Sequence, residues 1–142
     1  MKPKILLSKT WSSCPSDLSD IRKNVSNVCQ EVGYSEEQTN EIVLAIDEAC
    51  TNIIRYAYKD CRDGTIQLDV SHDNLQILFR LHDFAKQVSK DCIKTKPSTL
   101  LEPGGLGVML MREVMDSVEF VHTDQCAGNI LEMKKKLPKE CN

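Results

Sequence analysis

Between residues 18 and 58, hydrophobic residues recur every three or four positions, which is the spacing of amphipathic helices. The first run ends at Gly33, and glycine commonly terminates helices. Ser35 and Gln38 then have the spacing of a capping box, so a second helix is predicted to begin there and to run to about Tyr58. The apolar positions of the first predicted helix are Leu18, Ile21, Val25, Val28, Cys29 and Val32.

Shorter stretches alternate hydrophobic and polar residues and predict β-strands. Ile66, Leu68 and Val70 form one such stretch, and residues 75–81 form another after the turn-forming sequence SHDN. Together they predict a β-hairpin with one buried face. The remaining elements expected are strands at residues 4–9, 118–123 and 130–137, and a third helix from the glycines near residue 104 to about residue 115.

The predicted order of elements, β-α-α-β-β-loop-α-β-β, is typical of the α+β class. We expect a two-layer α/β sandwich in which about three helices cover one face of a mixed, mostly antiparallel sheet. No internal repeat is visible, so residues 1–142 are expected to form a single domain. Residues 84–103 show little periodicity, and such a stretch within a compact domain is typical of a functional loop or lid.

Composition narrows the classes of function. The net charge is −3 and only 5% of the residues are aromatic, which argues against a nucleic-acid-binding surface. The longest apolar runs, residues 42–46 and 106–111, are far too short to cross a membrane. The apolar triplet near the N-terminus is also too short for the core of a signal peptide, so a cytoplasmic protein without a membrane partner is expected.

The seven cysteines do not form a recognisable metal or disulfide pattern. No two of them have the CxxC spacing of structural zinc sites. His122 and Cys126 come nearest to a ligand pair, but two such residues in a turn are weak support for a metal site. Free thiols are the simpler interpretation, and they fit a reducing compartment.

Three glycines stand within four positions in the segment Gly104-Gly105-Leu106-Gly107, directly before the third predicted helix. Glycine clusters occur where the backbone needs unusual dihedrals or approaches another group closely. One interpretation is a flexible turn that leads into the helix. The other is a phosphate-binding loop, because backbone N–H groups at the start of a helix attract anions.

Glu48 and Asn52 are four residues apart on the polar side of the second predicted helix. The ordinary interpretation of such a pair is a solvated helix face. The alternative is a site of phosphoryl transfer, in which the carboxylate accepts a hydroxyl proton and the amide oxygen binds Mg²⁺. The long loop that follows the hairpin could cover this face.

Three motifs in a fixed order now carry a resemblance to a known family. They are DEACTNIIRYAY, an aspartate at the end of a strand in LHDFA, and EPGGLGVMLMREVMD. With them the chain resembles the GHKL ATP-binding fold and, within it, the bacterial anti-sigma factor serine kinases of the RsbW kind. The resemblance covers roughly residues 5–137.

The resemblance implies ATP and Mg²⁺ as cofactors and a role for each matching residue. Glu48 would be the general base, Asn52 would ligate Mg²⁺, and Asp83 would accept a hydrogen bond from the adenine amino group. The glycine segment would bring backbone amides to the phosphates. The cofactor-binding set implied in this way is Asn52, Asp83, Ala85, Gly104, Gly105, Leu106 and Gly107.

The same resemblance implies the partners of the protein. Such kinases sequester a sigma factor and phosphorylate a serine of an anti-anti-sigma factor with a STAS domain, and they usually form homodimers. A histidine kinase is a weaker alternative, because the chain has no room for a phosphoacceptor helical hairpin.

Two positions depart from the pattern of the family. Ala85 stands where the family has a glycine, and its methyl group would be strained if the position requires a positive φ. Ile130 stands at the position where the family usually has a serine or threonine near the adenine. An isoleucine there cannot make the hydrogen bond of that hydroxyl group, and its loss would weaken nucleotide binding about tenfold. These departures leave open a second function, a non-catalytic partner-switching module with a weakened nucleotide site.

Overall fold

The computed structural model describes residues 2–85, 105–121 and 128–138. The order of the elements confirms the predicted α+β class. The strands and main helices are β1 (Lys4–Ser12), α1 (Leu18–Val32), α2 (Glu36–Asn52), β2 (Thr65–His72), β3 (Gln76–Asp83), α5 (Gly105–Val114), β4 (Ser117–Val121) and β5 (Asn129–Lys136). A short 3₁₀ helix (Pro15–Asp17) precedes α1, and a π-helix (Ile53–Ala57) follows α2.

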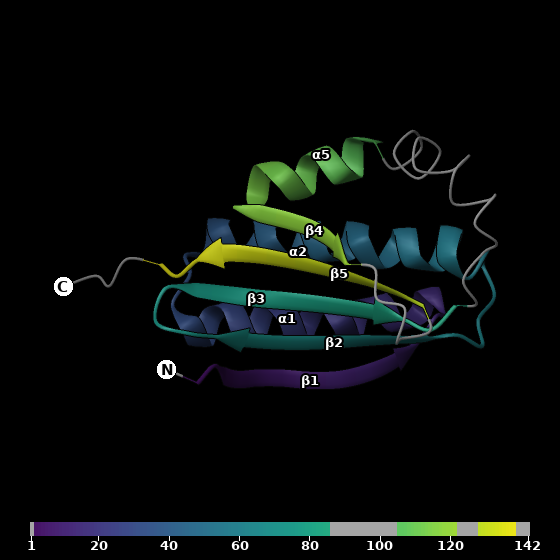
Figure 1. Ribbon diagram of the computed structural model, residues 1–142, viewed down its shortest axis with the longest axis horizontal. Helices are drawn as coiled ribbons and strands as arrows, with labels where there is room; N and C mark the ends of the chain where they lie inside the picture. Colours follow the sequence, from purple (N-terminus) through teal and green to yellow (C-terminus); the bar gives the residue numbers. More distant parts are fainter. Residues whose placement is uncertain (1, 86–104, 122–127, 139–142) are drawn as a thin grey trace.

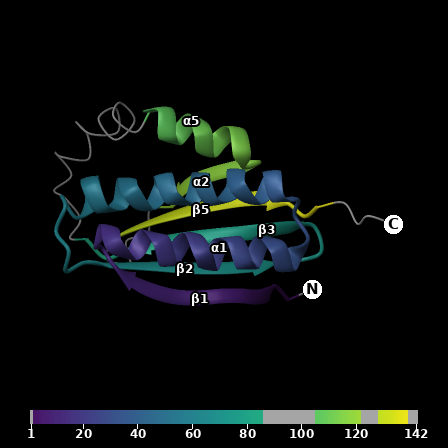
Figure 2. The ribbon, with the colours of Figure 1, turned by 180° about the vertical axis from the view of Figure 1, so that it is seen from behind.

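The strands form one five-stranded sheet in the order β1-β2-β3-β5-β4. Each neighbouring pair is antiparallel within the described residues. The helices α1 and α2 lie behind the sheet in Figure 1 and in front of it in Figure 2, so they cover the same face. α5 lies beside α2, on the side away from α1, and next to β4. This arrangement confirms the predicted two-layer sandwich.

The ends of the first two helices follow the capping signals in the sequence. α1 stops at Gly33, which takes the left-handed conformation with φ 105°. At the start of α2, the Gln38 N–H donates to Ser35 Oγ at 3.1 Å, and the Ser35 N–H donates to Gln38 Oε1 at 3.1 Å. The predicted capping box is therefore present.

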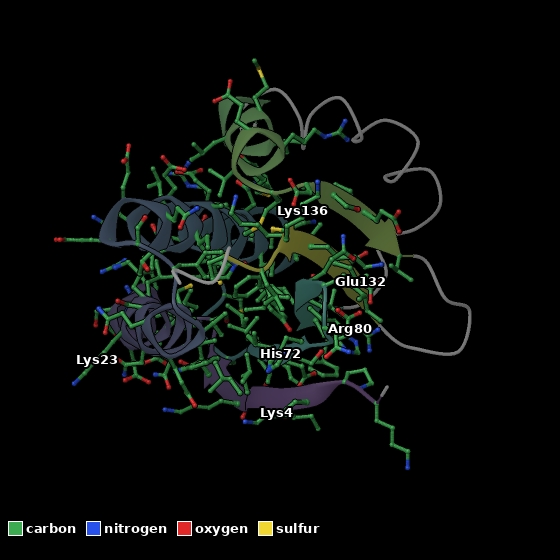
Figure 3. All side chains as sticks on the ribbon, turned by 90° about the vertical axis from the view of Figure 1, so that its left-hand side faces the viewer. Lys4, Lys23, His72, Arg80, Glu132 and Lys136 are labelled. Atoms are coloured by element: carbon green, nitrogen blue, oxygen red, sulfur yellow. The ribbon has the colours of Figure 1, made fainter. Side chains whose placement is uncertain are left out.

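The hydrophobic core lies between the sheet and the helices. Alternate strand residues point into it, among them Leu68, Phe79 and Met133, while Ile46 of α2 and Met111 of α5 close it from the other layer. The opposite face of the sheet is more polar. Arg80 and Glu132 form a cross-strand ion pair there, with 2.5 Å between Nη2 and Oε2, and Figure 3 shows both on the side away from the helices.

The second helix differs from its prediction after residue 52. We expected one continuous helix to about Tyr58, but the last turns are a π-helix, in which the Tyr58 N–H donates to the carbonyl oxygen of Ile53, five residues earlier. Lys59 and Asp60 then take positive φ values of 50° and 63° and end the helical segment. Hydrophobic spacing does not distinguish a π-turn from an α-turn over one turn, so the sequence could not reveal it.

No helix in the described ranges combines the length and the apolar character that crossing a membrane requires.

Candidate active site

Glu48 and Asn52 lie on the flank of α2 that faces α5. Asp47, one residue earlier, points to the opposite flank, because its Oδ1 accepts a hydrogen bond from Arg22 of α1 at 2.8 Å. Each residue advances a helix by about 100°, so Glu48 and Asn52 are turned away from α1. α2 lies between α1 and α5 in both views (Figures 1 and 2). The pair therefore faces α5, and not bulk water alone as a solvated face would.

Both side chains are half-buried, and neither makes a hydrogen bond or ion pair to another of the described residues. With respect to the described residues, the oxygen atoms of this carboxylate and this amide are available to accept a hydrogen bond or to bind a cation. The predicted chemistry of Glu48 and Asn52 is therefore compatible with their surroundings. The assignment of a base and a magnesium ligand stays a prediction.

Three element ends meet at one end of the molecule. The C-terminal ends of α2 and β3 lie there together with the N-terminal end of α5, opposite the chain termini (Figure 1). Gly105, Leu106 and Gly107 form the first turn of α5, as expected. The unpaired N–H groups and positive dipole end of this helix are suited to a phosphate group. Gly104, most of the predicted lid and the pair His122 and Cys126 lie outside the described residues.

Asp83 ends β3 and is a buried carboxylate, with 3% of its surface exposed. Its Oδ1 accepts hydrogen bonds from the Ala85 N–H and from Nδ2 of Asn129, each at 3.2 Å. Within the described residues, its Oδ2 has a longer contact of 3.4 Å to the same Asn129 nitrogen, and the backbone N–H of Asn129 also donates to this carboxylate. Oδ2 can therefore still accept a hydrogen bond from a ligand, as an exocyclic amino group would require.

Burial raises the pKa of the Asp83 carboxyl above its usual range, because the charged form loses hydration. The hydrogen bonds donated by Asn129 and Ala85 act in the opposite direction. A charged carboxylate held in such a place costs stability that a surface aspartate would not cost. A residue of this kind is a candidate for ligand binding.

The contact from Asn129 corrects the sequence interpretation. We assigned Ile130 to the position beside the adenine, but Asp83 pairs with Asn129 in the sheet and Ile130 pairs with His82. Ile130 consequently lies on the opposite face, and its apolar side chain does not replace a polar group at Asp83. The available signal was Gly128, which directly precedes the polar residue that enters the site.

Gly128 allows β5 to begin against Asp83. Its φ is 94°, and a Cβ atom at this position would lie 1.8 Å from the Asp83 carbonyl oxygen. Any larger residue would force the two backbones apart. The position thus explains why Asn129 can reach the carboxylate.

Ala85 does not show the strain that we considered. In the described ranges, Lys59 and Asp60 are the non-glycine residues with positive φ, so Ala85 has an ordinary backbone conformation. Its methyl group is buried, and its N–H supports Asp83. The neighbouring Phe84 ring stacks on His82, with 4.1 Å between the ring centroids, on the open face of the sheet.

The family model for the histidine kinase-like ATPase domain matches residues 11–135. The chain belongs to the histidine kinase-like ATPase family. Among curated proteins, the serine-protein kinase RsbW of Bacillus licheniformis is 32% identical over 135 residues, which cover 89% of this chain and 82% of that protein. RsbW of Bacillus subtilis (strain 168) is 33% identical over 113 residues, covering 73% and 70% respectively.

A third relative, RsbW of Bacillus cereus (strain ATCC 10987 / NRS 248), is 30% identical over 128 residues, or 84% of this chain and 78% of that protein. These matches confirm the predicted resemblance to serine kinases of the RsbW kind. They also agree with the fold, because the match to the histidine kinase-like ATPase family includes α2, Asp83 and the start of α5.

The donor groups present fit the adenosine nucleotide and Mg²⁺ that the histidine kinase-like ATPase family implies. Asp83 offers a buried acceptor for the base, the first turn of α5 offers N–H groups for phosphates, and Asn52 offers an amide oxygen for a hard cation. All three come from the same end of the molecule (Figure 1).

Proposed function

We propose that this protein is an ATP-dependent protein-serine kinase and anti-sigma factor. It would sequester a sigma factor and phosphorylate a serine of a STAS-type anti-anti-sigma factor. Three features support the proposal: the similarity to RsbW kinases, the half-buried pair of Glu48 and Asn52, and the buried carboxylate of Asp83. The main structural support is Asp83 Oδ2, a buried oxygen atom that can still accept a hydrogen bond from a nucleotide base.

In this mechanism, Asp83 accepts a hydrogen bond from the base and sets the position of the nucleotide. Asn52 would hold Mg²⁺ through its amide oxygen, and the N–H groups of Gly105, Leu106 and Gly107 would bind phosphate oxygens. When bound, Mg-ATP would supply the phosphoryl group and leave as ADP when the bond between its β- and γ-phosphates breaks. Glu48 would accept the proton of the partner's serine hydroxyl as that oxygen forms its bond to the phosphorus.

The proposal extends to features that accompany this activity. We expect the whole chain to act as a single cytoplasmic domain, to form a homodimer, and to need neither nucleic acid nor a membrane. Residues 84–103 would act as a lid over the nucleotide. Light scattering of the purified protein tests the dimer directly.

The direct test of the kinase is transfer of labelled phosphate from Mg-ATP to the serine of the cognate antagonist. We expect the wild-type protein to phosphorylate the antagonist. An antagonist whose acceptor serine is replaced by alanine is the control and should stay unlabelled. Absence of transfer to the wild-type antagonist, with ATP shown to bind, would contradict the kinase assignment.

The buried methyl group of Ala85, at a position where the family has a glycine, favours one alternative. In that case the protein would be a partner-switching module that binds its partners without catalysis. Calorimetric titration with ADP and Mg²⁺ separates the two functions. No heat and no thermal shift at millimolar ADP would support the module, whereas a clear isotherm supports the kinase.

A further inference from the structure

Tyr58 connects the end of the π-helix to two strands through a single hydroxyl group. The hydroxyl donates to the carbonyl oxygen of Thr65 at 2.5 Å and accepts from the Thr65 N–H at 3.2 Å. It also accepts from the Phe84 N–H at 2.7 Å. The phenol therefore uses both its donor and its acceptor capacity on the backbone of β2 and of the segment after β3.

The ring of Tyr58 is held as firmly as its hydroxyl group. A Cβ atom at residue 64 would lie 2.4 Å from the ring, so Gly64 leaves the space that the ring occupies. At the other end of the residue, the Tyr58 N–H donates to the Ile53 carbonyl oxygen at 3.0 Å. The position of the hydroxyl is thus set by the π-helix on one side and by the glycine on the other.

The Tyr58 hydroxyl accepts a hydrogen bond from the Phe84 N–H, and this N–H belongs to the peptide bond directly after Asp83. The next N–H, that of Ala85, donates to the Asp83 carboxylate. Two successive backbone N–H groups are therefore fixed, one by Tyr58 and one by Asp83 itself. Any movement of the Phe84 peptide would shift the Ala85 N–H and, with it, the orientation of the carboxylate.

We propose that Tyr58 is a positioning residue for nucleotide binding, which acts by holding the backbone that orients the Asp83 carboxylate. This inference rests on the proposed function, because it assigns the carboxylate to the base of a nucleotide. Tyr58 also follows Asn52 by only six residues. One hydroxyl thereby links the segment that holds the base to the segment that holds the metal ligand.

The substitution Tyr58→Phe tests the inference, because it removes the hydroxyl and keeps the ring on Gly64. We expect the Kd for ADP to rise about five- to tenfold, the change that loss of one well-placed hydrogen bond produces. The KM for ATP should rise by a similar factor, while kcat at saturating ATP stays nearly constant. The preference for ADP over GDP should also decrease, since the orientation of Asp83 selects the base.

The matched control is Tyr56→Phe. Tyr56 lies two residues earlier and makes no hydrogen bond through its hydroxyl to the described residues. This variant should keep the wild-type Kd and base preference. Its thermal midpoint, and that of Tyr58→Phe, should be measured alongside by calorimetry.

The possible outcomes separate the inference from the proposed function. If the wild-type protein does not bind ADP, the proposed function fails and this inference fails with it. If the wild-type protein binds ADP and Tyr58→Phe binds it equally well, only the inference is overturned. A lower thermal midpoint with a reduced kcat and an unchanged KM would show a purely structural role and would also overturn it.

Discussion

The two ends of the candidate site differ in the burial of their polar side chains and in the hydrogen bonds that these side chains make within the fold. At the base end, Asp83 is buried and receives hydrogen bonds from Ala85 and Asn129. At the phosphate end, Glu48 and Asn52 are half-buried and have no hydrogen-bond partner among the described residues. The fold therefore orients Asp83, the proposed base end, before any ligand binds, whereas at the proposed phosphate end the contacts would come from the ligand and the partner.

This difference predicts that mutations at the two ends will have different effects on activity and on stability. Changes at the phosphate end should reduce activity with little effect on stability, because no folded contact is lost. Changes at the base end should alter stability and nucleotide affinity together. Proteins commonly accept a loss of stability where a binding site needs a buried polar group.

The largest expected effect is that of Glu48→Gln on phosphoryl transfer. The amide cannot accept the serine proton, so the rate should fall by about 10² to 10⁴. ADP affinity and the thermal midpoint should stay close to those of the wild-type protein. Single-turnover labelling of the antagonist measures the rate, and calorimetry measures the rest.

The matched control for Glu48→Gln is Glu41→Gln. Glu41 is exposed and lies about two turns earlier on α2. This variant should phosphorylate the antagonist at the wild-type rate. A Glu48→Gln protein that retains full transfer would remove the base assignment and leave the ADP-binding half of the proposal intact.

Gly128→Ala tests whether the base end depends on close backbone contact. The added Cβ atom would meet the Asp83 carbonyl oxygen at 1.8 Å, and the φ of 94° is unfavourable for alanine. We expect a loss of about 2–4 kcal/mol in the free energy of unfolding. ADP binding should weaken as well, because Asn129 and Asp83 are pushed apart.

Gly33→Ala is the control for the loss in free energy of unfolding expected of Gly128→Ala. Gly33 has a similar φ of 105°, but its added Cβ atom would meet only Pro138 Cγ, at 3.8 Å. Its cost should be that of the backbone conformation alone, about 1 kcal/mol. Equal losses for the two variants in urea denaturation would mean that the close approach at Asp83 has no energetic consequence.

Asp83→Asn should weaken ADP binding about tenfold or more and make the free protein more stable. Because the folded-state pKa of Asp83 is raised, its favourable contribution is complete below its ordinary value of 3.8 and is lost as the pH rises through the folded value. At neutral pH the wild-type protein therefore carries the cost of a buried charge. The variant should unfold a few degrees higher at pH 7.

The pH dependence distinguishes this explanation from a general improvement in packing. The advantage of Asp83→Asn in the thermal midpoint should shrink as the pH is lowered toward 4. A constant advantage from pH 4 to pH 8 would rule out the buried charge as its cause.

The sequence predicted the parts of the molecule that local signals control. The capping box at Ser35 and the stop at Gly33 were confirmed because each depends on a few neighbouring residues. Alternation gave β2 and β3, and helical spacing placed Glu48 and Asn52 together. Their flank toward α5 could not be predicted, since it depends on which side of α2 the other helices pack.

The base end was less predictable because residues far apart in sequence form it. Asp83 and Asn129 are brought together by sheet pairing, and a register error of one residue led to Ile130. Side chains alternate between faces, so that error exchanges the buried and the open face. Tyr58 was missed for a related reason, because the position of its hydroxyl depends on a π-turn and on backbone contacts with Thr65 and the more distant Phe84.

Asn129→Ala gives the smallest expected effect and the finest test of the comparison. The substitution removes the Nδ2 donor and leaves the backbone N–H groups of Ala85 and residue 129 as the described donors to Asp83. Since the bond from Asn129 lowers the pKa of this carboxyl, its loss should raise the pKa further. We expect ADP to bind about three- to tenfold more weakly, with a larger difference in acidic than in mildly alkaline solution, because the raised pKa favours the protonated carboxyl at low pH. Titrations at an acidic and at a mildly alkaline pH measure this, with Asn24→Ala on α1 as the control. An equal loss of affinity at both pH values would mean that Asn129 contacts the base directly and does not act by tuning Asp83.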